Sequence, residues 1–137
     1  RVGAAAAPVL VVTEGLLVYL TAEQVAALAR ELHAQAAFRW WLIDLASPRL
    51  LAMLAKGWGK SLAAGNAPMQ FAPPEGTKFF EPHGWREVEY RSAWEESFRL
   101  NRTMPLGQLW RFIGRLMSKK RQEAGRRMSG FVLLERT

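Results

Sequence analysis

The run PVLVVTEGLLVYL, residues 8–20, constrains the fold of this chain more than any other feature. Its first six residues are rich in branched apolar side chains, as in strands that are buried on both faces. One carboxylate, Glu14, and then Gly15 interrupt the apolar run before it resumes. Because an unpaired buried charge carries a large penalty, Glu14 is expected at the end of a strand, where it can face a crevice rather than a core.

Size and composition limit the class of protein. The chain has 137 residues, half of them hydrophobic, which suits one domain folded around a core. It has no cysteine, so disulfide frameworks and thiolate zinc sites are excluded. No apolar run approaches the ~20 residues of a membrane span, and residues 1–7 lack the apolar centre of a secretory signal. We therefore expect a cytoplasmic protein without a membrane partner.

The expected strands and helices alternate along the chain. Strands are predicted at residues 8–13, 38–45, 86–91 and 130–137, and helices at residues 22–35, 48–64, 92–100 and 105–121. Residues 65–77 contain three prolines and two glycines and are predicted to form a loop. The order β-α-β-α-loop-β-α-α-β is typical of an α/β architecture with a mostly parallel sheet.

Capping residues mark the expected helix starts. Thr21 and Gln24 have the spacing of a capping box. Ser47 is predicted as an N-cap, with Pro48 at the first helical position. Ser92 is predicted to cap the helix over residues 92–100 in the same way.

A nucleotide-binding turn does not follow the first strand. Dinucleotide-binding domains need a glycine-rich turn there, and the sequence has none. GWGKS, residues 57–61, comes nearest to a phosphate-binding loop. That motif requires a glycine five residues before its Gly-Lys-Ser triplet, where this chain has Leu54. Since the segment also lies inside a helical pattern, we interpret the match as a coincidence.

Basic residues gather near the end of the chain. The formal net charge is +7, and residues 119–127, KKRQEAGRR, contain five basic side chains. Lys and Arg near a helix C-terminus complement its dipole, which favours a solvated helix end. Nucleic acid is therefore an unexpected partner. The alternative function is a non-catalytic module that binds nucleic acid or an acidic partner through residues 111–127.

The segment PVLVVTEGLLVYLTAEQV resembles a family of enzymes, the leucine carboxyl methyltransferase-like group of S-adenosylmethionine-dependent methyltransferases. In that family the fourth strand ends in Glu-Gly or Glu-Cys, followed by an apolar pair and Val-Tyr or Met-Tyr. The segments FFEPHGWREVEYRS and FVLLER also resemble its bacterial members, so the resemblance spans nearly the whole chain. It implies the C-terminal half of a Rossmann-like class I methyltransferase sheet, with parallel strands, a final antiparallel strand, and helices on both faces.

The resemblance also implies that half of a domain is missing. The family places a glycine-rich cofactor loop, a ribose-binding acidic residue and three strands before the fourth strand, and none of these is present. Residues 1–137 are therefore expected to be the C-terminal half of one methyltransferase domain. Its parts are residues 1–64, the loop and turn segment 65–85, and residues 86–137. Such a fragment is expected to be inactive alone.

S-adenosyl-L-methionine is the cofactor that the resemblance implies. The family's matching glutamate accepts a hydrogen bond from the ammonium of the methionine part, which assigns that role to Glu14. Gly15 would let the backbone approach the cofactor, and Tyr19 matches the family's tyrosine. Alternatives remain for two of them: Glu14 could cap the next turn or pair with a surface arginine, and Tyr19 could serve packing alone.

Two residues are candidates for contact with the methyl acceptor. Asp44 ends the second strand on the crevice side, and His83 lies in the turn EPHGW. Alternatively, Asp44 is a turn residue before the Ser47 helix, and His83 is a hydrogen-bonded residue of its turn. No histidine has partners at ligand spacing, so no metal site is predicted. The implied methyl transfer, to an oxygen of a small molecule or carboxylate, depends on alignment and exclusion of water, and the sequence identifies no catalytic residue.

The strand at residues 8–13 has consequences for assembly. If the preceding strands are absent, this strand becomes an exposed apolar edge that favours pairing with another chain. We expect either the missing N-terminal half or a second copy to pair with it. A non-catalytic remnant that works only by association is the third hypothesis.

Overall fold

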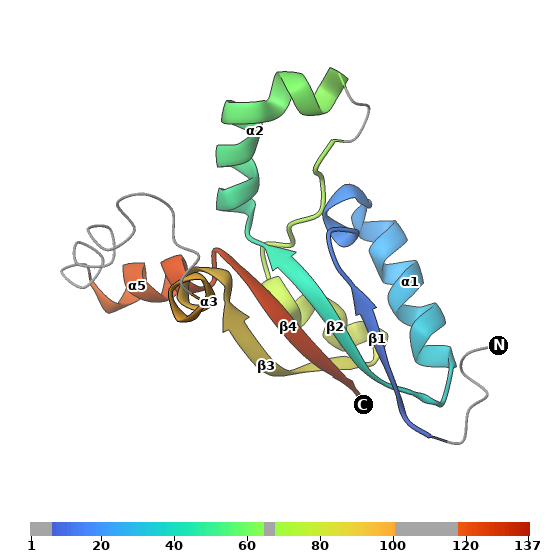
Figure 1. Ribbon diagram of the computed structural model, residues 1–137. Helices are drawn as coiled ribbons and strands as arrows, with labels where there is room; N and C mark the ends of the chain where they lie inside the picture. The colour runs from blue at the N-terminus through green and yellow to red at the C-terminus, as the bar shows by residue number, and fades with distance from the viewer. Residues whose placement is uncertain (1–6, 65–67, 101–117) are drawn as a thin grey trace.

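The computed structural model describes residues 7–64, 68–100 and 118–137, without the side chains of residues 57–64. Four strands form one sheet in the order β1-β2-β4-β3 (Figure 1). The strands are β1 (Val9–Thr13), β2 (Phe38–Ala46), β3 (Trp85–Ser92) and β4 (Ser129–Arg136). The helices are η2 (Leu17–Tyr19), α1 (Ala22–Ala34), α2 (Pro48–Ala64), η3 (Gly76–His83), α3 (Ala93–Arg99) and α5 (Lys119–Arg126), where η denotes a 3-10 helix.

Strand directions confirm the predicted mixed α/β sheet. β1 pairs with β2 in parallel, and β4 is antiparallel to both β2 and β3. Thus β1, β2 and β3 run in one direction, and β4 runs in the opposite direction. The carboxyl ends of the three parallel strands meet at one end of the sheet, where open α/β sheets bind their ligands.

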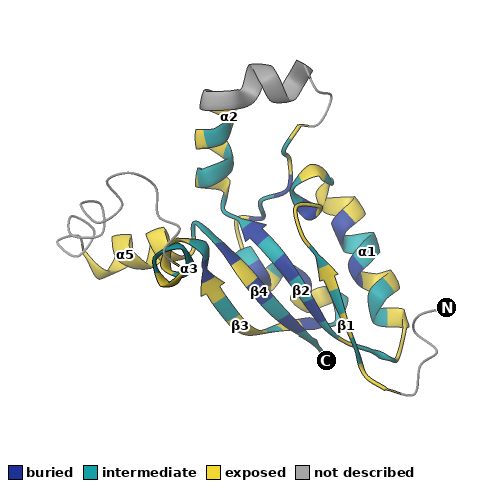
Figure 2. Ribbon diagram, in the orientation of Figure 1, coloured by how far each residue is buried: buried dark blue, intermediate teal, exposed yellow. Residues whose placement is uncertain are grey.

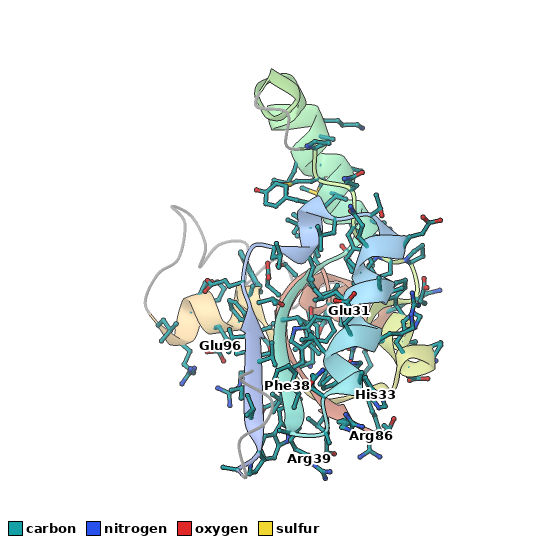
Figure 3. The ribbon with its side chains drawn as sticks, turned by 90° about the vertical axis from the view of Figure 1, so that its right-hand side faces the viewer. Glu31, His33, Phe38, Arg39, Arg86 and Glu96 are labelled. Atoms are coloured by element: carbon teal, nitrogen blue, oxygen red, sulfur yellow. The ribbon has the colours of Figure 1, made fainter. Side chains whose placement is uncertain are left out.

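The hydrophobic core lies on one face of the sheet. α1 and η3 cover this face and lie together on the same side of the strands (Figures 1 and 3). Figure 2 shows the buried positions between these helices and the sheet. They include Trp41 and Ile43 of β2, Val132 of β4, Val25 of α1 and Phe80 of η3, each at most 1% exposed. Burial of these large side chains is the main stabilising term of the fold.

Two buried tryptophans fix the positions of neighbouring elements. The Trp41 Nε1 donates a hydrogen bond to the Thr13 Oγ1 at 3.0 Å, which connects β2 to β1. The Trp85 Nε1 donates to the Ala29 carbonyl at 2.9 Å, which connects β3 to α1. The two indole rings also meet edge to face, with centroids 5.6 Å apart. Each buried N–H thus has a partner, as burial requires.

The opposite face of the sheet carries exposed apolar side chains. Leu10 and Val12 are 48% and 56% exposed, and Phe131 is 41% exposed. Leu10 pairs with Trp40 and Val12 with Leu42, so these side chains share one face. The expectation of helices on both faces is confirmed: α3, which carries Glu96, lies on this side of the sheet and α1 on the other (Figure 3), but Leu10, Val12 and Phe131 stay exposed.

Local signals located most helix starts correctly. The Thr21 Oγ1 accepts a hydrogen bond from the Gln24 N–H, and the Gln24 side chain accepts one from the Thr21 N–H, so the capping box is confirmed. The Ser47 hydroxyl accepts from the Leu50 N–H at 3.3 Å. Ser92 is the N-cap residue of α3, as predicted, but its side chain makes no capping hydrogen bond. Ser92 ends β3, and its hydroxyl is buried without a partner.

The last predicted helix is not continuous through residue 121. Ser118 has extended backbone angles, φ −59° and ψ 149°, and α5 begins only at Lys119. Serine favours helix starts over helix interiors, which agrees with a break there. Residues 105–117 of this prediction lie outside the described residues. GWGKS, by contrast, lies within α2, as its helical pattern indicated.

Replacing the buried indole of Trp85 should destabilise the fold. Trp85→Phe removes the donor to the Ala29 carbonyl and leaves a small cavity, so the free energy of unfolding should fall by about 1–3 kcal/mol. Trp94→Phe is the matched control; Trp94 is 37% exposed, and a change within about 0.5 kcal/mol is expected. Urea unfolding measures both. Equal losses of unfolding free energy in the two variants would contradict the role of Trp85 in the core.

Candidate functional site

The carboxyl ends of β1 and β2 are joined by one hydrogen bond. The chain leaves β1 through Gly15, whose φ of +62° lies in the left-handed region. Only glycine adopts this conformation without strain. In it, the Gly15 N–H donates to the Asp44 Oδ1 at 2.9 Å. Asp44 therefore remains part of β2 and fixes the turn after β1, instead of forming a turn before α2.

The segment that returns from α2 is attached to η2. The backbone N–H groups of Gln70 and Phe71 both donate to the Val18 carbonyl, at 2.7 and 3.1 Å. The Gln70 side-chain amide also donates to the Tyr19 carbonyl at 2.9 Å. Leu17, between the turn and these contacts, is buried in the core. Together these contacts hold residues 68–71 beside the end of β1.

A cavity of about 260 Å³ opens between these segments, here called the β1–β2 cavity. Its wall includes Gly15, Tyr19, Asp44, Leu50, Leu51, Leu54, Met69 and Phe71. The polar groups come from the strand ends, and the apolar groups come from α2 and the returning segment. A mostly apolar hollow with a few convergent polar groups is the usual form of a small-molecule site.

Glu14 directly precedes Gly15 of the cavity wall, and its carboxylate has no partner among the described residues. It is exposed, next to Gly15, and makes no hydrogen bond or ion pair with any residue that the structure describes. Neither alternative for it, a turn cap or a pair with a surface arginine, is found in that part of the chain. The carboxylate is therefore available to a cationic ligand group.

The structure brings three of the five predicted site residues to one cavity, and Glu14, which precedes Gly15 in the chain, is not among the residues that line it. Gly15, Tyr19 and Asp44 line the β1–β2 cavity. His83 lies elsewhere: it ends η3 just before β3 begins, at the opposite end of the sheet. Its ring contacts Phe79, and burial together with the Arg30 charge lowers the pKa of the imidazole.

A second cavity, of about 200 Å³, lies on the other side of the β2 carboxyl end. We call it the β2–β3 cavity; its polar lining comes from Ser47, Glu75, Thr77, Tyr90 and Arg127. It shares Leu45 and Ala46 with the β1–β2 cavity. The two hollows therefore flank the last residues of the same strand.

An ion pair beside the β2–β3 cavity was not predicted from the sequence. The Arg127 guanidinium donates to both Glu87 oxygens, at 3.1 and 3.3 Å, and lies 4.7 Å from the centre of the Tyr90 ring. The Thr77 hydroxyl donates to the same carboxylate. The alternation in REVEYR indicated that Glu87 lies in a strand, but nothing local indicated a partner that is 40 residues away.

The basic end of the chain is partly neutralised. Arg126 pairs with Glu95 at 2.8 Å, and Arg127 pairs with Glu87. Lys119, Lys120 and Arg121 are exposed on α5, which agrees with a solvated helix.

Metal clusters and membrane-spanning helices are two further features that the described ranges lack. No group of three or more His, Asp or Glu side chains there is arranged to hold a metal ion. No described helix has both the length and the apolar composition needed to cross a bilayer.

Comparison with known proteins finds likenesses among solved structures alone. No protein-family model matches the chain, and no curated protein matches it. Among solved structures, the chain is similar to magnesium protoporphyrin IX methyltransferase (ChlM) from Synechocystis PCC 6803 with bound SAH. The identity is 14% and the TM-score 0.49; the match covers 100% of this chain and 49% of ChlM. The chain thus spans about half the length of that protein.

The left-handed turn at Gly15 can be tested by a single methyl group. An added Cβ there meets no atom within 4 Å, so Gly15→Ala changes backbone strain alone. We expect the free energy of unfolding to fall by about 1–2 kcal/mol. Gly125→Ala is the matched control, because that site is equally open but lies in helix α5, where alanine should stabilise by up to about 1 kcal/mol. A neutral or stabilising Gly15→Ala would contradict the geometry of this turn.

The Glu87 carboxylate should make stability depend on pH. Burial opposes its ionisation, but the hydrogen bonds from Arg127 and Thr77 outweigh burial and lower its pKa below the ordinary 4.5. This stabilisation is present above the unfolded pKa and is lost as pH falls through the folded pKa. At about pH 7, Glu87→Gln should unfold with a lower free energy than the unchanged chain. This difference should become smaller as the pH falls to about 3. A deficit that is constant over this range would contradict the ion pair.

Proposed function

We propose that this chain is part of an S-adenosyl-L-methionine-dependent methyltransferase and binds the methionine end of the cofactor. The proposal rests on the exposed carboxylate of Glu14, which has no partner among the described residues and directly precedes Gly15 of the β1–β2 cavity. It stands at the carboxyl end of a parallel strand, where α/β sheets bind their ligands.

The groups around the cavity fit this part of the cofactor. The methionine end carries an ammonium, and Glu14 offers a carboxylate without a partner among the described residues. At Gly15 the absence of a side chain leaves open space, so a ligand can approach the backbone closely. The apolar wall formed by Leu54 and Phe71 suits the methylene groups between the ammonium and the sulfonium.

The residues of the chain would contribute orientation and exclusion of water. When bound, S-adenosyl-L-methionine supplies a methyl group on a sulfonium, a reactive electrophile. Glu14 would hold the ammonium, and Asp44 is a positioning residue, because it acts through its hydrogen bond to the Gly15 N–H. Tyr19 and Phe71 would keep water from the cavity. An ionised oxygen acceptor needs no general base, so alignment is the main requirement.

We further propose a leucine carboxyl methyltransferase-like enzyme that acts in the cytoplasm on an oxygen of a small molecule or carboxylate. The motif TEGLLVYL supports the family. Since the chain has no glycine-rich turn to hold the remaining part of the cofactor, activity is expected only when the preceding half of the domain is supplied. The alternative, a basic binding module, is weakened by the acidic partners of Arg126 and Arg127.

Weak binding by the isolated chain can be measured residue by residue. In nitrogen-15 NMR titrations, millimolar S-adenosyl-L-methionine should shift the amide signals of Gly15 and Tyr19. Methylthioadenosine, which lacks the amino-acid end, should leave them in place. Glu14→Gln should weaken binding by about tenfold, the loss of one charge-assisted hydrogen bond.

Glu31→Gln is the matched control, because Glu31 is exposed on α1 (Figure 3). It should bind like the unchanged chain. Equal shifts with methylthioadenosine, or an unchanged affinity in Glu14→Gln, would overturn the proposed role of the site.

A further inference from the structure

The β2–β3 cavity lies next to the proposed cofactor site, on the other side of the β2 carboxyl end. The two cavities share Leu45 and Ala46 as parts of their walls. We propose that the β2–β3 cavity binds the methyl acceptor, and that the acceptor is a small neutral molecule whose hydroxyl group donates a hydrogen bond to the Glu75 carboxylate. This inference rests on the proposed function, because only a methyltransferase needs a methyl acceptor.

The order of the strands favours this side of β2 for the acceptor. β1 forms one edge of the described sheet, whereas β4 and β3 lie beyond β2 (Figure 1). Under the proposed function, the preceding half of the domain lies beside β1 and holds the rest of the cofactor. The acceptor then approaches the methyl group from the side of β4 and β3, where the β2–β3 cavity lies. Methyl transfer requires reacting atoms about 3–3.5 Å apart, and a shared wall brings the two cavities together.

Two hydroxyl donors of the cavity already have acceptors within the chain. The Thr77 hydroxyl donates to the Glu87 carboxylate, and the Tyr90 hydroxyl donates to the Arg126 carbonyl at 3.4 Å. Burial raises the pKa of Tyr90, so its hydroxyl keeps its proton at neutral pH. A ligand that accepts hydrogen bonds would compete with these partners, whereas a ligand that donates them would not.

The positive charge at the cavity is balanced as well. The Arg127 guanidinium pairs with Glu87 at 3.1 Å and with Glu123 at 3.4 Å. Glu75 also lines the cavity; it is exposed, and its carboxylate makes no hydrogen bond or ion pair with any residue that the structure describes. A ligand with its own carboxylate would bring a like charge beside Glu75. The cavity therefore favours a neutral ligand with a hydrogen-bond donor.

The size and the apolar wall of the cavity suit a small, flat molecule. The volume of about 200 Å³ equals the liquid volume of about six or seven water molecules, which suits a small molecule and not a peptide. Leu45, Pro48, Pro73, Pro74 and the Tyr90 ring form the apolar part of the wall. A phenol combines a flat apolar ring with one hydroxyl donor, so it represents this class of acceptor.

The free carboxylate of Glu75 also suits the chemistry of a hydroxyl acceptor. In the transfer, the hydroxyl oxygen forms a bond to the methyl carbon while the carbon–sulfur bond of the sulfonium breaks, and the sulfur keeps the electron pair of that bond. The hydroxyl proton passes to the Glu75 carboxylate and then to water, because Glu75 is exposed. A carboxylate acceptor is already ionised and would need no proton acceptor here.

Nitrogen-15 NMR titrations with three small probes test the inference. Phenol at millimolar concentration should shift the amide signals of Thr77 and Tyr90. Anisole lacks the donor hydroxyl and benzoate carries a negative charge, so each should bind about fivefold more weakly or less. Glu75→Gln should weaken phenol binding by about fivefold, the difference between a charged and a neutral acceptor. Glu81→Gln is the matched control and should bind phenol like the unchanged chain, because Glu81 is exposed on the same helix, η3, but does not line the cavity.

Several outcomes would overturn the inference. Benzoate or anisole that binds as tightly as phenol would do so, as would an unchanged affinity in Glu75→Gln or the absence of phenol shifts at Thr77 and Tyr90. The cofactor titration separates this failure from that of the proposed function, since S-adenosyl-L-methionine should shift Gly15 and Tyr19. Cofactor shifts without phenol shifts would contradict the acceptor site alone. Phenol shifts without cofactor shifts would contradict the methyltransferase function, and with it the role of the phenol as an acceptor.

Discussion

The hydrogen bond from the Gly15 N–H to the Asp44 carboxylate determines the arrangement around the site. It joins the ends of two parallel strands and holds the turn after β1 in a left-handed conformation. That turn directs the chain into η2, whose Val18 carbonyl holds the segment returning from α2. The cavity, its apolar wall and the exposed position of Glu14 all follow from this connection.

Local signals in the sequence predicted the elements well, because strand and helix periods and caps depend on near neighbours. The capping box at Thr21 and the start of α2 after Ser47 are examples. The site was partly predictable for the same reason: Gly15 and Asp44 follow or end strands that run in parallel. His83 is not at the site because β4 fixes the direction of β3, and the segment before β3 therefore lies at the far end.

Features that depend on distant partners could not be predicted in this way. The pairing of Glu87 with Arg127 requires β3 and the residues before β4 to be adjacent in space. The buried hydroxyl of Ser92 depends on its place at the end of β3, beside Gly130 of β4, where the sheet and not the following helix determines its surroundings. The exposure of Leu10, Val12 and Phe131 on the second face of the sheet is likewise a property of the whole arrangement. In each case tertiary contacts override a local preference.

We propose that the carboxyl ends of β1 and β2 hold the amino-acid end of S-adenosyl-L-methionine. A crystal structure of the chain with the cofactor tests it most directly. The account predicts the methionine part in the β1–β2 cavity, with its ammonium within hydrogen-bonding distance of the Glu14 carboxylate. Cofactor bound with its adenine in that cavity, or bound only at the β2–β3 cavity, would contradict it.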